Sequence, residues 1–226
     1  MRILAYHSIN NSVREAGAQL YCVSEDAFRG QLEYLRGKDV VITFDDGDIT
    51  SYTKAYPILK EFNVLAYFFI IGEWVGAPGY MNWDQISELK HGGMIIGSHG
   101  MSHRVLTTLN DEDLGYEFGS SKKLLEDKLK TPIETISIPR GLCNKKVINK
   151  IREYGYVKVF TSDPDDSGDF LCGRIAVRAD WDMKHFMHAV DNGPSLKDKT
   201  MSFIKKSSRA ILGDKGYDLL RSRILK

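Results

Sequence analysis

Short apolar runs recur along the chain and are separated by longer stretches in which apolar and polar residues are mixed. The run from Val64 to Ile71 is apolar on both faces, which is typical of a strand in a parallel sheet that is covered on both sides. The others are shorter but have the same character. We predict strands at residues 2–6, 40–44, 64–71, 94–98, 136–138, 157–161 and 174–177.

The stretches between these runs carry apolar residues at helical spacing. Ser24 is a good N-cap for a helix with Phe28, Leu32 and Leu35 on one face. Asn110 is placed to cap a second helix, whose first turn is acidic. We predict helices around residues 25–35, 57–62, 83–90, 111–129 and 147–154.

Strands that alternate with helices predict right-handed β-α-β units and a parallel sheet. The residues whose side chains could act in catalysis or bind a metal follow the carboxyl ends of the predicted strands. In a barrel, these strand ends form the active-site face. An open doubly wound sheet would more naturally carry a glycine-rich phosphate loop after its first strand, and this chain has none. We therefore expect an α/β barrel domain over residues 1–192. The residues at the strand ends are His7, Asp45, Asp46, His99, His103, Arg140 and Asp163.

Two short motifs at these strand ends point to a metal site. Thr43 to Gly47 (TFDDG) ends in two adjacent carboxylates, and Ser98 to His103 (SHGMSH) holds two histidines four positions apart. One carboxylate and two imidazoles suit an open divalent-metal site, and the second carboxylate is then free to act as a base. The two histidines can share one face if the chain turns helically between them.

In these motifs the chain resembles the polysaccharide deacetylase family, the NodB-homology group known as carbohydrate esterase family 4. That family carries T-F-D-D-G followed by H-[ST]-x-x-H, and the likeness extends over roughly residues 1–180. The resemblance implies a distorted (β/α)7 barrel that removes N-acetyl groups from amino sugars with zinc or a similar ion. It assigns Asp45 as the catalytic base and Asp46, His99 and His103 as the metal ligands.

The chain departs from this family around the predicted fifth strand. Ser137 stands where the family has the arginine that steadies the base, and Arg140 stands where it has an aromatic residue. We expect Arg140 either to pair with Asp45 or to bind an anionic substrate. Pro139 and Arg140 are therefore placed with the substrate-binding residues, together with Trp83 as a platform for a sugar ring.

The family's late Leu-x-His motif, whose histidine protonates the leaving amine, has no clean match. His185 and His188 lie in a segment with a helical pattern. We select His7 as the acid instead, because the first and last strands of a closed barrel are neighbours. Asp163 is the candidate carboxylate that orients His7.

Composition and charge limit the classes of binding partner that the sequence favours. The formal net charge is +1, which gives no electrostatic argument for nucleic acid. Residues 193–226 form a basic amphipathic tail, read either as a helix across the barrel or as a contact with an anionic membrane. The start of the chain does not read as a secretory signal, so we expect a cytoplasmic protein, peripheral at the inner membrane face if the tail binds lipid.

These features predict a metal-dependent carbohydrate N-deacetylase that uses Zn²⁺. Its substrate is an N-acetylated amino sugar in a glycan or in a lipid-linked or nucleotide-linked precursor. Two alternatives stay open. One is a deformylase or other C–N amide hydrolase on a small sugar-like substrate, and the other is a glycan-binding pseudoenzyme, suggested by Ser137 and the missing late histidine.

Overall fold

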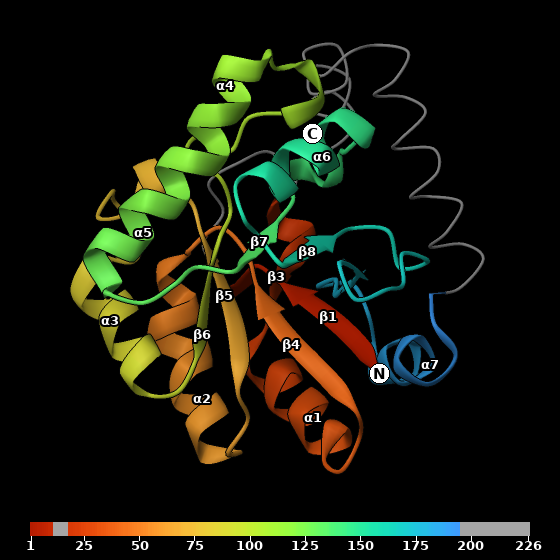
Figure 1. Cartoon of the computed structure of the whole chain (residues 1–226). Helices are drawn as coiled ribbons and strands as arrows, with labels where there is room; N and C mark the ends of the chain where they lie inside the picture. The colour runs from red at the N-terminus through yellow and green to blue at the C-terminus, as the bar shows by residue number, and fades with distance from the viewer. Residues whose placement is uncertain (11–17, 195–226) are drawn as a thin grey trace.

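One parallel sheet of eight strands forms the centre of the protein, seen in a computed structural model that describes residues 1–10 and 18–194 (Figure 1). The strand order is β10-β1-β4-β5-β6-β7-β8-β9, and every pairing is parallel. The strands are β1 (Arg2–Tyr6), β4 (Val40–Phe44), β5 (Ala66–Ile70), β6 (Ile95–Ser98), β7 (Thr135–Ser137), β8 (Lys158–Thr161), β9 (Leu171–Gly173) and β10 (Ile175–Ala176). A separate two-stranded pair joins β2 (Ser8–Ile9) to β3 (Cys22–Val23).

The sheet is nearly closed into a barrel. Its two edge strands, β9 and β10, are consecutive in the chain and are separated only by Arg174. The predicted α/β fold with a barrel-like parallel sheet is confirmed, and strands alternate with helices from β1 to β8. The sheet has eight strands where we expected seven, and β8, β9 and β10 follow one another without a helix between them. The additional strand, β9, is three residues long and only its central residue, Cys172, is buried, so it leaves little periodic signal in the sequence.

Helices cover the outside of the sheet (Figure 1). Ser24 and Asn110 cap α1 and α4 as predicted, each accepting a hydrogen bond from a backbone amide in the first turn. Two π-helical segments, Ser51–Ala55 and Tyr116–Ser120, run directly into α2 and α5. The helices are α1 (Glu25–Leu35), α2 (Tyr56–Glu61), α3 (Trp83–His91), α4 (Asp111–Gly115), α5 (Ser121–Leu129), α6 (Lys145–Glu153) and α7 (Met183–Asn192).

Alternation along the strands divides the core into two parts. Phe68 belongs to the large cluster shared with the helices, whereas its neighbour Phe69 packs with Ile3 and Phe160 in a small cluster inside the barrel. Gly97 of β6 fits beside this inner cluster because a Cβ there would lie 2.5 Å from the Phe69 ring. The barrel is therefore packed below the edge where the strands end, and that edge carries the functional residues.

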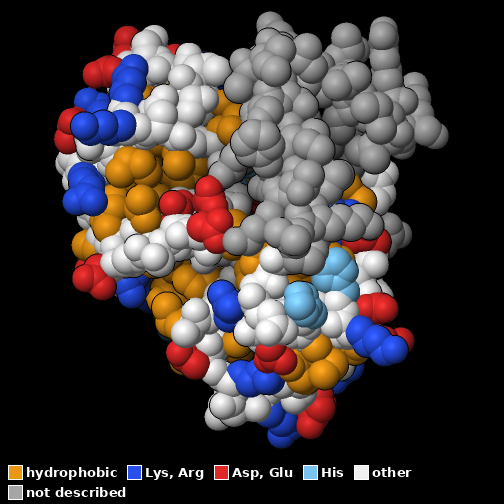
Figure 2. Space-filling model, turned by 90° about the vertical axis from the view of Figure 1, so that its right-hand side faces the viewer, with side chains coloured by type: hydrophobic (Ala, Val, Ile, Leu, Met, Phe, Trp, Pro, Cys, Tyr) orange, Lys and Arg blue, Asp and Glu red, His pale blue; other side chains and the backbone are white. Residues whose placement is uncertain are grey.

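The remaining surface is of mixed character. On the described part of one face, lysine, arginine and acidic side chains are interspersed with apolar ones, in keeping with the balanced net charge (Figure 2). Among the described residues, no helix is long and apolar enough to cross a membrane. Most of the predicted basic tail, residues 195–226, lies outside the described part of the chain.

Candidate metal centre and catalytic site

The turn after β4 sends two adjacent carboxylates in different directions. Asp45 continues the strand, with its amide bonded to the carbonyl of Tyr6, and is 4% exposed. Asp46 and Gly47 both adopt left-handed backbone conformations, with φ of 72° and 74°. That conformation is costly for a non-glycine residue such as Asp46, and such strain is concentrated at functional sites. It allows Asp46 to face the histidines while Asp45 stays inside the barrel mouth.

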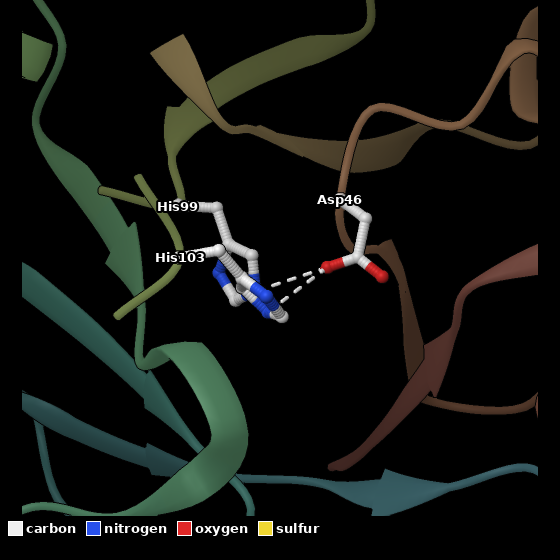
Figure 3. Close-up of side chains that lie close together, drawn as sticks. All are labelled: Asp46, His99 and His103. Carbon is white, nitrogen blue, oxygen red and sulfur yellow. Dashed lines mark ion pairs between the residues drawn. The ribbon is translucent and has the colours of Figure 1, made fainter. Parts of the chain in front are cut away.

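Asp46, His99 and His103 converge on one point, as Figure 3 shows. Asp46 Oδ1 lies 3.3 Å from His99 Nε2 and 3.5 Å from His103 Nε2. Bonds of about 2.0–2.2 Å to a tetrahedral ion place neighbouring ligand atoms roughly 3.3–3.6 Å apart. The carboxylate-to-imidazole spacings therefore fit a divalent cation held by these three side chains.

The tautomer of His99 also fits a metal ligand. Its Nδ1 lies 3.0 Å from the backbone carbonyl oxygen of Ser137, which can only accept a hydrogen bond, so Nδ1 carries the proton. In the neutral ring Nε2 is then the atom with a free lone pair, and in the protonated ring the same atom donates a hydrogen bond to Asp46. His99 is 2% exposed, so the backbone carbonyl and the barrel wall fix the orientation of its ring.

The segment between the two histidines is not helical, so the condition under which spacing alone would place them on one face is not met. Residues 99–105 form an irregular loop after β6, and both Gly100 and His103 have left-handed backbone angles, with φ of 77° and 59°. The imidazoles still approach each other, with ring centroids 5.2 Å apart. Their convergence therefore depends on how this loop is held, and spacing alone does not produce it.

Arg174 holds Asp45, and the sequence analysis missed it. Its guanidinium donates to both Asp45 carboxylate oxygens, at 2.7 and 2.8 Å, and the two side chains are almost fully buried. Ser137 Oγ also donates to Asp45, at 3.1 Å. The expected pairing of Arg140 with Asp45 is replaced by this contact. Arg174 lies between the two edge strands of the barrel and supplies the positive charge that Ser137 cannot supply to Asp45.

Burial and neighbouring positive charges shift the pKa values of Asp45 and Asp46 in opposite directions. Burial raises the pKa of Asp45, but the charges of Arg174, His99 and His7 outweigh it and hold that pKa below its ordinary value. Burial also raises the pKa of Asp46, but the hydrogen bond to His99 and the charges of His103 and His7 hold it far below its ordinary value. Both carboxyl groups are therefore ionised at neutral pH, as a ligand and a base require.

The pKa values of His99 and His103 shift in opposite directions, although the two rings lie in the same site. Burial lowers the pKa of His103 to about 4, so its ring is neutral at pH 7. Burial lowers the pKa of His99 too, but the charges of Asp45 and Asp46 outweigh it and raise that pKa. A cation must displace a proton from an imidazole before it binds, so metal affinity is expected to fall in acid.

His7 lies at the same barrel mouth. Its positive charge helps to lower the pKa of both Asp45 and Asp46. Its ring stacks on that of Tyr21, with centroids 4.8 Å apart. Its Nδ1 is buried and has no hydrogen-bond partner among the described residues. The Asp163 carboxylate accepts a hydrogen bond from the Asp165 amide within its own turn. Asp163 as the residue that orients His7 stays a prediction, as does His7 as the acid.

The residues assigned to the substrate lie in different places. Pro139 is buried, and Arg140, with a φ of 56°, donates from Nε to the backbone carbonyl of His103. Trp83 begins α3 and packs against the outer apolar core. Trp74 is the tryptophan beside the metal site, with its ring 5.1 Å from that of His103.

Comparison with known proteins places this site in a family. A model of the family described as polysaccharide deacetylase matches residues 33–159, more than half of the chain. The peptidoglycan-N-acetylmuramic acid deacetylase PdaA of Bacillus subtilis is 30% identical over an alignment of 159 positions, which covers 69% of this chain and 58% of that protein. The poly-beta-1,6-N-acetyl-D-glucosamine N-deacetylase of Staphylococcus aureus is 28% identical over an alignment of 200 positions, which covers 71% of this chain and 69% of that protein. The chain spans about half the length of the first curated relatives it matches.

Solved structures share the fold. The deacetylase PplD of Streptococcus pyogenes, in complex with acetate, superposes with a TM-score of 0.76 at 23% identity, covering 84% of this chain and 98% of PplD. IcaB of Ammonifex degensii superposes with a TM-score of 0.71, also at 23% identity, covering 86% of this chain and 97% of IcaB. With the matched family model and the Asp46, His99 and His103 cluster, these observations lead to one conclusion: the chain belongs to the polysaccharide deacetylase family.

Proposed function

We propose that this protein hydrolyses the N-acetyl group of an amino sugar in a glycan, using a zinc ion held by Asp46, His99 and His103. One observation carries the proposal. Three potential ligands meet at one point, and beside them a buried carboxylate, Asp45, is fixed by two hydrogen bonds from Arg174, with Oδ2 4.0 Å from His99 Nε2. A held base next to an open cation site is the arrangement that amide hydrolysis needs.

The chemistry divides among these residues as follows. A divalent cation bound at the three ligands would polarise the amide carbonyl and lower the pKa of water toward about 7. Asp45 accepts the proton of the water whose oxygen attacks the carbonyl carbon, and Arg174 keeps Asp45 ionised for that role. His7 donates a proton to the nitrogen as the C–N bond breaks. The products are acetate and the free amine of the sugar.

The surroundings of the site support a sugar as the substrate. The names of PdaA and of the Staphylococcus aureus relative specify N-acetylmuramic acid in peptidoglycan and poly-N-acetylglucosamine. Trp74 is only half-buried beside His103, so its ring offers an apolar face to one side of a pyranose. We expect Trp74→Ala to raise KM severalfold while the zinc content is unchanged, whereas an unaltered KM would remove Trp74 from the binding surface.

The test is acetate release by the zinc-loaded protein. The panel contains β-1,6 and β-1,4 oligomers of N-acetylglucosamine, peptidoglycan fragments and nucleotide-linked N-acetyl sugars, each with an N-formyl counterpart. We expect acetate release from at least one N-acetyl substrate. Asp45→Asn should lower the rate by about 10²–10⁴-fold, the usual contribution of a general base.

Two outcomes would contradict the proposal. Preferential release of formate would indicate a deformylase. Full zinc occupancy without hydrolysis of any member of the panel, or with a residual rate that Asp45→Asn leaves unchanged, would favour a glycan-binding pseudoenzyme. The position of Arg174 argues against the pseudoenzyme. Ser137 brings no positive charge to Asp45, but the Arg174 guanidinium supplies one from the edge of the barrel.

A further inference from the structure

The loop that joins the two histidine ligands is held by a buried carboxylate. Glu117 lies in the π-helical segment Tyr116–Ser120, and its side chain is fully buried. Its Oε2 accepts hydrogen bonds from the backbone amides of Met101, at 2.8 Å, and Ser102, at 3.1 Å. Its Oε1 accepts a hydrogen bond from the Ser102 hydroxyl. One carboxylate thus takes three hydrogen bonds from two consecutive residues between His99 and His103.

The same carboxylate explains why glycine follows His99. A Cβ at position 100 would lie 2.7 Å from Glu117 Oε2, closer than real Cβ contacts allow. Gly100 also has a φ of 77°, which side chains rarely tolerate. Its amide is held by Ser98 Oγ at 3.1 Å. In this chain the buried acid at position 117 therefore leaves no room for the Ser or Thr that the resemblance led us to expect at position 100.

These contacts hold the loop between His99 and His103 in place, which the four-residue spacing of the histidines does not do by itself. The segment is irregular, so no helical hydrogen bonds hold His103 relative to His99. On its other side the loop accepts hydrogen bonds from the amides of Gly72 and Glu73, at 3.0 and 2.9 Å. Glu117 supplies the bonds from the helix side, and they take up amide hydrogens that would otherwise be buried without partners.

We propose that Glu117 is a positioning residue for the metal site, which sets the separation of the two imidazoles and so the affinity for the cation. This inference rests on the proposed metal site, but it concerns binding and does not depend on which bond is hydrolysed. Groups that orient metal ligands typically change metal affinity about 10–100-fold when they are altered. Glu117 acts on the backbone between two ligands, so we expect an effect in this range.

The first test measures zinc affinity by chelator competition at constant pH, without substrate. We expect Glu117→Gln to weaken zinc binding about 10–100-fold, because the amide keeps the shape but replaces one of the two accepting oxygens with a donor NH₂ group. Leu125→Ala, a buried residue of the continuing helix α5, is the matched control. It should lower stability while zinc affinity stays within twofold. Equal affinities for Glu117→Gln and the wild-type protein would overturn the proposal.

A second readout reports geometry directly. The visible spectrum of the Co²⁺-substituted protein depends on the arrangement of the ligands, so Glu117→Gln should change its band positions or intensity, and Leu125→Ala should not.

A cycle of variants tests the link to Gly100. Gly100→Ala should weaken zinc binding severalfold more in the wild-type background than in Glu117→Ala, because the clash is removed there. Equal effects in both backgrounds, or unchanged cobalt spectra, would overturn the proposal. Absence of acetate release by the zinc-loaded wild-type protein would count against the proposed function alone.

Discussion

At the residue scale, the site is organised by a few buried side chains that hold the reactive ones. The TFDDG motif and the two histidines could be identified from the sequence, because they follow strands whose apolar pattern is clear. Arg174 could not, because it meets Asp45 across 129 positions of chain. An arginine inside the apolar run from Leu171 to Val177 is the signal that could have drawn attention to it.

Replacing Arg174 tests the state of the proposed base. Arg174 lowers the pKa of Asp45, so Arg174→Met should raise it, and the acidic limb of the kcat/KM profile should move to higher pH. Leaving one member of a buried pair alone should also cost about 3–5 kcal/mol of stability. Arg174→Lys restores a charge without the bidentate geometry and should give intermediate values. An acidic limb at the wild-type pH in a folded Arg174→Met protein would show that Arg174 does not control Asp45.

His7 is tested by changing the leaving group. An amide nitrogen must be protonated as it leaves, whereas an activated phenyl ester leaves without help. His7→Ala should therefore slow amide hydrolysis by about 10²–10⁴-fold but slow hydrolysis of an activated acetate ester far less. Its zinc content should equal that of the wild-type protein, because His7 is not among the three converging ligands. Equal losses on both substrates would argue against an acid role.

At the element scale, the strands and helices followed from periodicity with few errors. β1 and β4 have the predicted bounds, and β5 to β8 differ by a residue or two at their ends. β9 was missed because three residues with one buried side chain give no periodic signal. The irregular His99–His103 loop was also missed, since its shape is set by Glu117 and by left-handed backbone angles that spacing does not show.

Packing inside the barrel can be tested at β6. Gly97→Ala would place a Cβ 2.5 Å from the Phe69 ring and 2.6 Å from Thr135 Oγ1, so strands β5, β6 and β7 would have to shift. We expect a loss of about 1–3 kcal/mol in the free energy of unfolding by urea. Gly168→Ala, where no atom lies within 4 Å of the added Cβ, should change it by less than about 0.5 kcal/mol. Similar stability for both variants would mean that the inner cluster is less tightly packed than the contacts indicate.

At the scale of the whole molecule, the metal site joins the ends of two strands, β4 and β6, that lie on either side of β5. Asp46 follows β4, and the histidines follow β6, so a bound cation should cross-link the barrel mouth and stabilise the folded state. Free zinc at about 100 times its Kd contributes about 2.7 kcal/mol. For a chain of this length the melting temperature should rise by roughly 5–10 °C when zinc is added to chelator-treated protein. Asp46→Asn should lose most of this rise, and a rise as large as that of the wild-type protein would place the ion elsewhere.

The central claim is that one cation is bound by Asp46, His99 and His103. X-ray absorption at the zinc edge, with the zinc-loaded protein in solution, tests it most directly. We predict one zinc per chain, with two imidazole nitrogens and one carboxylate oxygen at about 2.0–2.2 Å and the remaining positions filled by light atoms from solvent. Asp46→Asn and His103→Ala should each change this shell. Sulfur ligands at about 2.3 Å, or an unchanged shell in both variants, would contradict the account.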